Sequence, residues 1–288
     1  MKTIIVCTDF STTATNAVQY AAALANAAKA RLILFHHFAY PVPATDFTSA
    51  YPTIFVDELS ADLERKLQDI KADLGKTYPI EIEYKLRSWD FSSDLEEAFH
   101  EEHVDLVVMG IHGQSAMVNV LFGSMTATAI RRGTLPLLVV PRAAAFHSIQ
   151  KILFPCDDYP IPSAKTLEPL RNLANVFDAY IEIFTLFDLE KTPQLVPQPR
   201  LSPAKMNLEM LLSGTKHGYS FENEATVNKG ILYEAARSSA DIVAMIPHHH
   251  TFLSSILNPS ETQRVAASIS VPLLVMGEKV HQMAEAEA

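Results

Sequence analysis

Glycine spacing is the first feature of the sequence that indicates chemistry. Only nine glycines occur in 288 residues, and three of them, Gly110, Gly113 and Gly123, fall within fourteen positions. Glycines let backbone N–H groups approach a phosphate closely. Ser124 and Thr126 follow in what we expect to be the first turn of a helix, where hydroxyls and unpaired N–H groups can hold an anion. The spacing predicts a phosphate-binding loop, although the same glycines could serve only tight turns.

Asp9 is the second candidate, because it directly follows the first apolar segment of the chain. Neither Gly-x-Gly-x-x-Gly nor a P-loop accompanies that segment, so the commonest nucleotide motifs are absent. In an open doubly wound sheet, ligands bind beyond the carboxyl ends of the strands where the strand order reverses. If the strands that precede Asp9 and Gly110 are neighbours, both residues face one crevice. A turn or cap role for Asp9 is the alternative, with Ser11 as a competing cap.

Apolar runs and helical patterns alternate in the first half of the chain. Near-continuous apolar strands with helices between them indicate a parallel sheet that is covered on both faces. Three prolines mark 39–55 as an irregular loop. The periodicity predicts strands over 4–7, 31–38, 80–86, 106–111 and 135–140, and helices over 12–30, 57–76, 90–102 and 124–132.

The chain repeats this pattern once. The strand-like start of the sequence recurs 148 positions later, around 151–158, and the segments 103–109 and 135–140 recur 136 positions later, over 239–245 and 271–276. Two copies are too few for a solenoid and fit two similar domains. We therefore predict an α/β protein of two tandem doubly wound, Rossmann-like parallel-sheet domains, over 1–145 and 146–280, with a tail over 281–288.

Charge and composition limit the partners. The chain has 23 Lys and Arg against 33 Asp and Glu, a formal net charge of −10. A body this acidic repels a nucleic-acid backbone, whereas backbone amides can still hold a small phosphorylated ligand. The apolar runs are too short for a secretory signal or a membrane span. Cys7 and Cys156 have no metal-ligand spacing and predict reduced thiols in a cytoplasmic protein.

Several other polar groups favour structural roles. His36 ends an apolar strand, which is more typical of a structural than of a catalytic histidine. His100 and His103 lie three apart on an expected helix without a third metal ligand, so we expect a solvated helix face. The acidic pairs at 96–97 and 101–102 are expected to face solvent too.

The spaced glycines resemble the signature of the universal stress proteins. The adenine-nucleotide-binding branch of that family carries Gly-x-x-Gly, nine residues, then Gly followed by Ser or Thr, and Gly110, Gly113, Gly123 and Ser124 match it without a gap. Thr8-Asp9-Phe10-Ser11 resembles the end of the family's first strand, where the Asp contacts the nucleoside. The resemblance covers nearly the whole chain, as two tandem domains with an adenine nucleotide alpha hydrolase-like fold.

The second strand carries a departure from the family. Phe35-His36-His37 is similar to the end of that strand, whose residue after the His lines the adenine pocket, but His37 stands where a small aliphatic side chain is more usual. Met109 and His112 suit the strand-four signature. The resemblance implies ATP, with Mg²⁺, bound by Thr8, Asp9, His37, Met109, Gly110, His112, Gly113, Gly123, Ser124, Met125 and Thr126.

The second copy has lost the glycines. Asp157 aligns with Asp9, but the stretch after 239–245, where the first copy has Gly110 and Gly113, contains Pro247 and His250 and no glycine, and Pro259-Ser260 replaces Gly123-Ser124. Proline lacks the N–H that would donate to phosphate, and a histidine side chain would fill the space that the phosphate needs. We infer that the second domain binds no ATP in the family's manner. The run His248-His249-His250 could bind a metal or an anion, or neither.

The resemblance also bears on assembly and function. The last strands of the two copies are strongly apolar and need covering, and the resemblance implies that they pair within the chain as a pseudo-dimer. A homodimer is a further option. We expect a nucleotide-linked sensor or regulator in stress response, with at most slow ATP hydrolysis, because no Walker-type lysine is seen. The alternatives are a nucleotide hydrolase or transferase and a binder of a small apolar or lipid-like ligand in the second domain.

Overall fold

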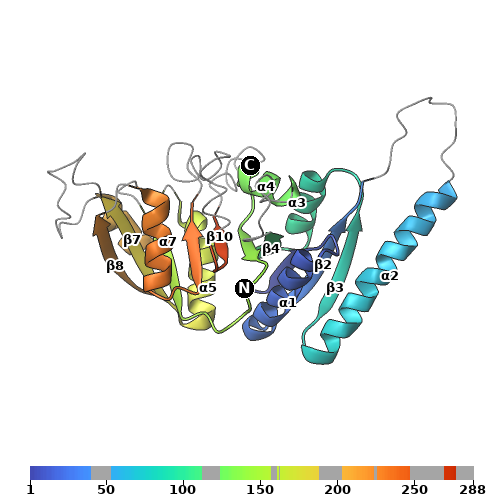
Figure 1. Cartoon of the computed structure of the whole chain (residues 1–288), viewed down its shortest axis with the longest axis horizontal. Coiled ribbons are helices and arrows are strands. Elements are labelled where there is room, and N and C mark those ends of the chain that lie inside the picture. The colour runs from blue at the N-terminus through green and yellow to red at the C-terminus, as the bar shows by residue number, and fades with distance from the viewer. Residues whose placement is uncertain are drawn as a thin grey trace, which may run out of the picture.

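Among the described residues, ten strands form one sheet in the computed structural model (Figure 1). The structure describes residues 1–39, 53–111, 124–156, 161, 163–187, 203–223, 226–246 and 269–276. The strand order is β3-β2-β1-β4-β5-β10-β9-β6-β7-β8. The strands are β1 Thr3–Cys7, β2 Arg31–His37, β3 Ile82–Arg87, β4 Leu106–Ile111, β5 Leu137–Pro141, β6 Lys151–Pro155, β7 Tyr180–Phe187, β8 Lys216–Asn223, β9 Ile242–Met245 and β10 Leu273–Val275.

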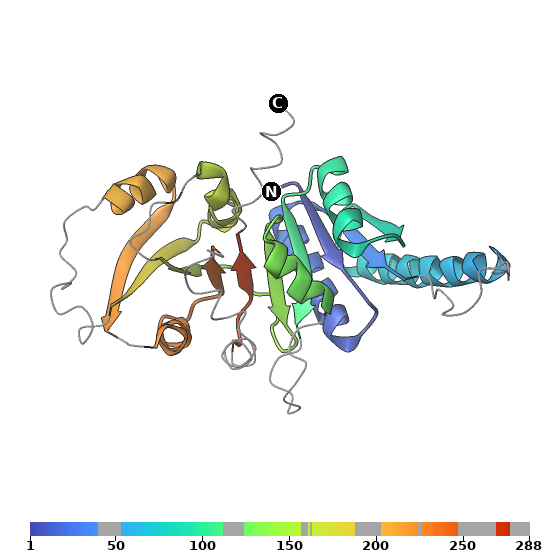
Figure 2. The ribbon, with the colours of Figure 1, turned by 90° about the horizontal axis from the view of Figure 1, so that it is seen from above.

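Helices lie on both sides of this sheet (Figure 2). One hydrophobic core joins α1, α2, α5 and α6 to the strands of both halves, while separate cores lie under α3 and α4 and under α7. No helix within the described ranges is long and apolar enough to cross a membrane. The helices are α1 Thr12–Ala28, α2 Thr53–Thr77, α3 Phe91–Glu101, α4 Ser124–Arg132, α5 Glu168–Phe177 (after a 3-10 turn, Ala164–Leu167), α6 Pro203–Leu211 and α7 Val227–Arg237.

The two halves meet through their last strands. β5 and β10 pair antiparallel, with Leu138 opposite Leu274 and Val139 opposite Leu273. Each half contributes five strands in the same relative order, and the other pairings in the sheet are parallel. This confirms the predicted internal pairing and the pseudo-dimer. Because the central pair is antiparallel, the carboxyl ends of the strands in the two halves lie at opposite edges of the sheet.

Most predicted elements of the first half are confirmed, and the differences have local causes. β4 and α4 have the predicted bounds, whereas α2 begins at Thr53 instead of at residue 57. A proline precedes Thr53, and a proline is common just before or at the first helical position. In the second half, Pro203 belongs to the start of α6 and not to the Pro-rich loop predicted over 189–203, for the same reason. The predicted domain limits remain predictions.

Helix α1 forms where its sequence predicts. Ser11 is its N-cap, and the Ser11 hydroxyl accepts the backbone N–H of Ala14 at 3.2 Å. Alanine is the best helix former, and small side chains let the helix lie close to the sheet. Lys29 ends the helix with a left-handed backbone, φ 54°. The helix therefore presents its capped N-terminus at the carboxyl edge of the first five strands.

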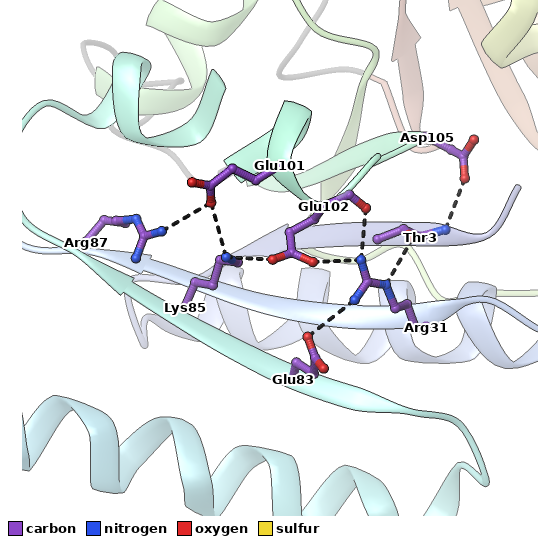
Figure 3. Close-up of polar contacts among 8 residues, drawn as sticks. All are labelled: Thr3, Arg31, Glu83, Lys85, Arg87, Glu101, Glu102 and Asp105. Carbon is purple, nitrogen blue, oxygen red and sulfur yellow. Dashed lines mark hydrogen bonds and ion pairs between the residues drawn. The ribbon is translucent and has the colours of Figure 1, made fainter. Parts of the chain in front are cut away.

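The prediction that the acidic pairs simply face solvent was wrong for Glu102 (Figure 3). Its carboxylate lies 2.7 Å from Arg31 on β2 and 2.7 Å from Lys85 on β3. The hydrogen bonds from Lys85 and then Arg31 lower the pKa of Glu102. Glu101 lies 3.4 Å from the same Lys85, and Glu96 lies 3.2 Å from Arg132. The pairs with Arg31 and Lys85 fasten the end of α3 to β2 and β3, and the pair with Arg132 joins α3 to α4. Sequence spacing alone does not reveal these contacts.

Candidate functional site

A cleft of about 140 Å³ lies at the carboxyl ends of β1, β2 and β4. β1 pairs with β2 on one side and with β4 on the other, so the chain order of the strands reverses at β1. Such a switch point is where doubly wound sheets bind ligands. The cleft is lined by Cys7, Thr8, Asp9, Ser11, Thr13, Ala14, Phe35, His37, Phe91, Met109, Gly110, Met125 and Thr126.

The turn between β1 and α1 forms the floor of the cleft. Oδ1 of Asp9 accepts the backbone N–H of Ser11 at 3.0 Å, and the Thr8 hydroxyl accepts the N–H of Phe10 at 3.1 Å. Phe10 has a positive φ of 62°, which is uncommon for a residue with a side chain. The Asp9 carboxylate thus helps to hold a strained turn, as the alternative turn role predicted, and it also lines the cleft.

His36 holds the ends of β1 and β2 together. Its Nδ1 lies 2.7 Å from the carbonyl oxygen of Thr8, and its ring contacts the Phe10 ring with centroids 4.5 Å apart. Burial lowers the pKa of His36, partly offset by the hydrogen bond to Thr8. A buried neutral imidazole with a backbone partner matches the structural role that the sequence favoured.

His37 points to the other side of β2 and lines the cleft. Its Nε2 lies 3.6 Å from Oδ2 of Asp94, and both side chains are largely buried. The Phe91 ring meets the imidazole edge-on at 5.9 Å between centroids. Oδ2 of Asp94 accepts the backbone N–H of Trp89 at 3.0 Å, so the start of α3 fixes the carboxylate beside the histidine.

The opposite wall of the cleft comes from β4 and α4. Met109 and Gly110 lie near the carboxyl end of β4, and Met125 and Thr126 belong to the first turn of α4. The Thr126 hydroxyl donates to the carbonyl oxygen of Gly110 at 3.2 Å. A Cβ atom at Gly110 would lie 2.8 Å from the carbonyl oxygen of Thr13, so a side chain there would collide with α1.

Two polar side chains of the cleft have contrasting chemistry. Oγ1 of Thr13 is buried and has no hydrogen-bond partner within the described part of the molecule. Such an orphaned hydroxyl is costly unless a ligand or water satisfies it. Burial raises the pKa of the Cys7 thiol far above its ordinary range. Cys7 is therefore protonated and a poor nucleophile.

The cleft brings together seven of the eleven residues predicted for the nucleotide site: Thr8, Asp9, His37, Met109, Gly110, Met125 and Thr126. Ser124 is the first residue of α4. His112, Gly113 and Gly123 lie outside the described residues, as do Asp157, Pro247, His248, His249, His250, Pro259 and Ser260. No cluster of three or more His, Cys, Asp or Glu that could hold a metal is found in the described ranges.

Sequence reasoning missed several lining residues. Thr13 and Ala14 lie in the first turn of α1, and Phe91 lies at the start of α3. Thr13 had a signal, because a helix that begins at a cleft presents its first-turn side chains to it. Phe91 and Asp94 had no signal in the sequence, because they reach His37 only through the packing of α3 on the sheet.

Comparison with known proteins gives matches for the first half of the chain. The model of the universal stress protein family matches residues 1–141. Universal stress protein MJ0577 from Methanocaldococcus jannaschii is 26% identical over 90 residues. That match spans 30% of this chain and 52% of the relative, so the chain spans about half the length of the curated relative that it matches.

Similar solved structures extend over both halves. A universal stress protein from Archaeoglobus fulgidus DSM 4304 aligns with a TM-score of 0.67 at 17% identity, covering 96% of this chain and 98% of the other. A functionally unknown protein from Pseudomonas aeruginosa PAO1 aligns with a TM-score of 0.56 at 13% identity, over 100% of this chain and 96% of the other. These likenesses concern the fold.

Proposed function

We propose, from the match of residues 1–141 to the universal stress protein family, that the chain is a tandem member of that family which binds ATP in the cleft of its first half. The proposed role is that of a nucleotide-linked sensor or regulator in stress response. The second half acts as a structural partner that covers the apolar edge of the first.

The observation that carries this proposal is the position and lining of the cleft. It lies at the switch point of the first five strands. Its walls include the end of β4 and the start of α4, which are the elements before and after the glycine signature. α4 begins at Ser124, directly after Gly123, so its N-terminal N–H groups lie at the end of the predicted phosphate loop.

The nucleoside is proposed to lie toward Asp9 and His37, and the phosphates toward Gly113, Gly123 and Ser124. A carboxylate such as Asp9 would repel a triphosphate, whereas it can accept a hydrogen bond from a ribose hydroxyl or an amino group. The orphaned Thr13 hydroxyl lines the same cleft and fits a polar ligand there. Mg²⁺ is proposed to accompany the phosphates.

Binding is favoured over rapid turnover. No lysine or arginine is among the described residues that line the cleft, and the Cys7 thiol is held protonated by burial. Phosphoryl transfer depends on positive groups or metal ions that stabilise the developing charge. We therefore propose at most slow ATP hydrolysis. Since neither Cys7 nor Cys156 is in a disulfide, the proposal includes the cytoplasm as location, with a homodimer as a further option.

The proposal is tested by identifying what the purified chain carries. Mass spectrometry of the small molecules released on denaturation is expected to find an adenine nucleotide, near one per chain. Gly113→Val is expected to lose it, because the added side chain collides with the phosphates. Gly75→Val is the matched control, since a Cβ at Gly75 in α2 meets nothing within 4 Å. A chain that releases no nucleotide and binds no added ATP would contradict the proposal.

A further inference from the structure

Asp94 determines which nitrogen of His37 carries the proton. Nε2 of His37 is buried without a hydrogen-bond partner in the described part of the chain, and Oδ2 of Asp94 is the carboxylate oxygen 3.6 Å away. A neutral imidazole has one N–H and one lone pair. A nearby carboxylate attracts the N–H and repels the lone pair. Neutral His37 therefore carries its proton on Nε2, which leaves Nδ1 as a hydrogen-bond acceptor.

An acceptor on the wall of the cleft distinguishes between purine bases. A 6-amino purine presents an N–H donor at position 6, whereas a 6-oxo purine presents an acceptor there. Nδ1 of neutral His37 can bond to the first and repels the second. When the imidazole is protonated, both of its nitrogens are donors and the preference no longer holds.

We propose that His37, oriented by Asp94, selects 6-amino over 6-oxo purine nucleotides. The inference rests on the proposed function, which puts the nucleoside at this end of the cleft. Proteins of the family that this chain resembles more usually carry a small aliphatic side chain at the position of His37. Such a side chain makes only apolar contact with the base, so it discriminates weakly between a 6-amino and a 6-oxo purine. The His37–Asp94 pair is thus a feature of this chain that changes what its cleft can recognise.

The charged groups around His37 come from every element packed against it. Acidic groups predominate among them, which agrees with an imidazole N–H turned toward Asp94. Arg87 on β3 is in register with His37, and its guanidinium lies 3.5 Å from the carboxylate of Glu101. The groups are Asp94 and the N-cap Asp90 of α3, Asp9 after β1, His36 on β2 and Arg87 on β3.

ATP and inosine triphosphate are matched probes for this selection, because they share ribose and phosphates and differ at the edge of the base around position 6. Isothermal titration calorimetry of the full chain with each nucleotide measures the two affinities. We expect ATP to bind at least about tenfold more tightly than inosine triphosphate at about pH 8.

Three variants separate the inference from general effects on folding. His37→Phe keeps a planar ring without nitrogens, and it is expected to bind the two nucleotides within about threefold of each other. Asp94→Asn removes the charge that selects the tautomer, and it is expected to reduce the preference at about pH 8. His147→Phe is the matched control, because His147 is exposed and does not line the cleft, and it is expected to retain the full preference.

The outcomes distinguish the inference from the proposed function. Equal binding of ATP and inosine triphosphate to the unmodified chain at about pH 8 overturns the inference and leaves ATP binding in place. A preference that survives His37→Phe overturns it as well. If neither nucleotide binds, the proposed function fails, and the inference that rests on it fails too.

Discussion

A Cβ atom at Gly110 would lie 2.8 Å from the carbonyl oxygen of Thr13, so β4 and α1 meet where no side chain fits. Both residues also line the cleft. The first glycine of the spaced motif therefore has a packing role that does not depend on any phosphate. It fixes the distance between β4 and α1, which both contribute lining residues to the cleft.

Gly110→Ala is expected to destabilise the fold by about 1–3 kcal/mol, because the added methyl group overpacks the contact with Thr13. Urea unfolding of the full chain measures this. Gly75→Ala is the control, because it lies in α2 with open space around its Cβ, and alanine there is expected to stabilise the chain by about 0.5–1 kcal/mol. Equal stability of the two variants would show that β4 and α1 are not in this contact.

Asp9 variants test the placement of the nucleoside. Asp9→Asn keeps the size and one acceptor, so it is expected to weaken ATP binding by on the order of 1 kcal/mol. Asp9→Ala is expected to cost more, since it also removes the acceptor of the Ser11 N–H in the β1–α1 turn. Calorimetry with and without Mg²⁺ should show the same metal dependence in both variants. Loss of the Mg²⁺ dependence in Asp9→Ala would put Asp9 beside the phosphates instead.

His36 is expected to make stability depend on pH. Burial lowers its pKa in the folded state, so the unfolded chain binds a proton more readily than the folded chain. Its contribution is therefore complete above about pH 6.5 and is lost as the pH falls below that value. The free energy of unfolding, measured from about pH 8 to pH 5 for the natural chain and for His36→Gln, gives the contribution as a difference. A difference that grows as the pH falls would contradict the assignment.

The β5–β10 pairing is expected to hold the two halves as one unit. Leu138 is fully buried opposite Leu274, so Leu138→Ala is expected to cost about 2–5 kcal/mol. Leu273→Ala, on the partner strand and less buried, is the control and is expected to cost less. Chemical denaturation measures both. Solution scattering that shows two flexibly linked halves would contradict the pairing itself.

The sequence predicts local features well because their causes are local. The bounds of β4 and α4 follow from apolar runs and from glycine and serine at the helix start, and the Ser11 cap follows from residue type and position. The internal repeat also predicts that the last strands of both copies need covering. Each of these inferences uses residues within a few positions of one another, or a pattern that recurs.

Contacts between distant segments could not be predicted in the same way. His37 and Asp94 are 57 positions apart, and their pairing depends on how α3 packs over β2. The sequence predicts that Glu102 is a surface carboxylate, but the packing of α3 brings it between Arg31 and Lys85. The sequence predicts that Gly110 contacts a phosphate. That a side chain at this position would collide with Thr13 depends on the path of α1. In each case, the periodicity of the side chains indicates which face of a helix or strand is buried, but not which other element packs against that face.

The stoichiometry of ATP binding to the full chain tests the central claim most directly. Isothermal titration calorimetry is expected to show one site per chain, because the second copy has lost its glycines. Gly113→Val is expected to weaken this site by more than about tenfold, while Gly75→Val leaves it unchanged. Two equivalent sites per chain, or one site that persists unchanged in Gly113→Val, would contradict a single nucleotide site in the first half.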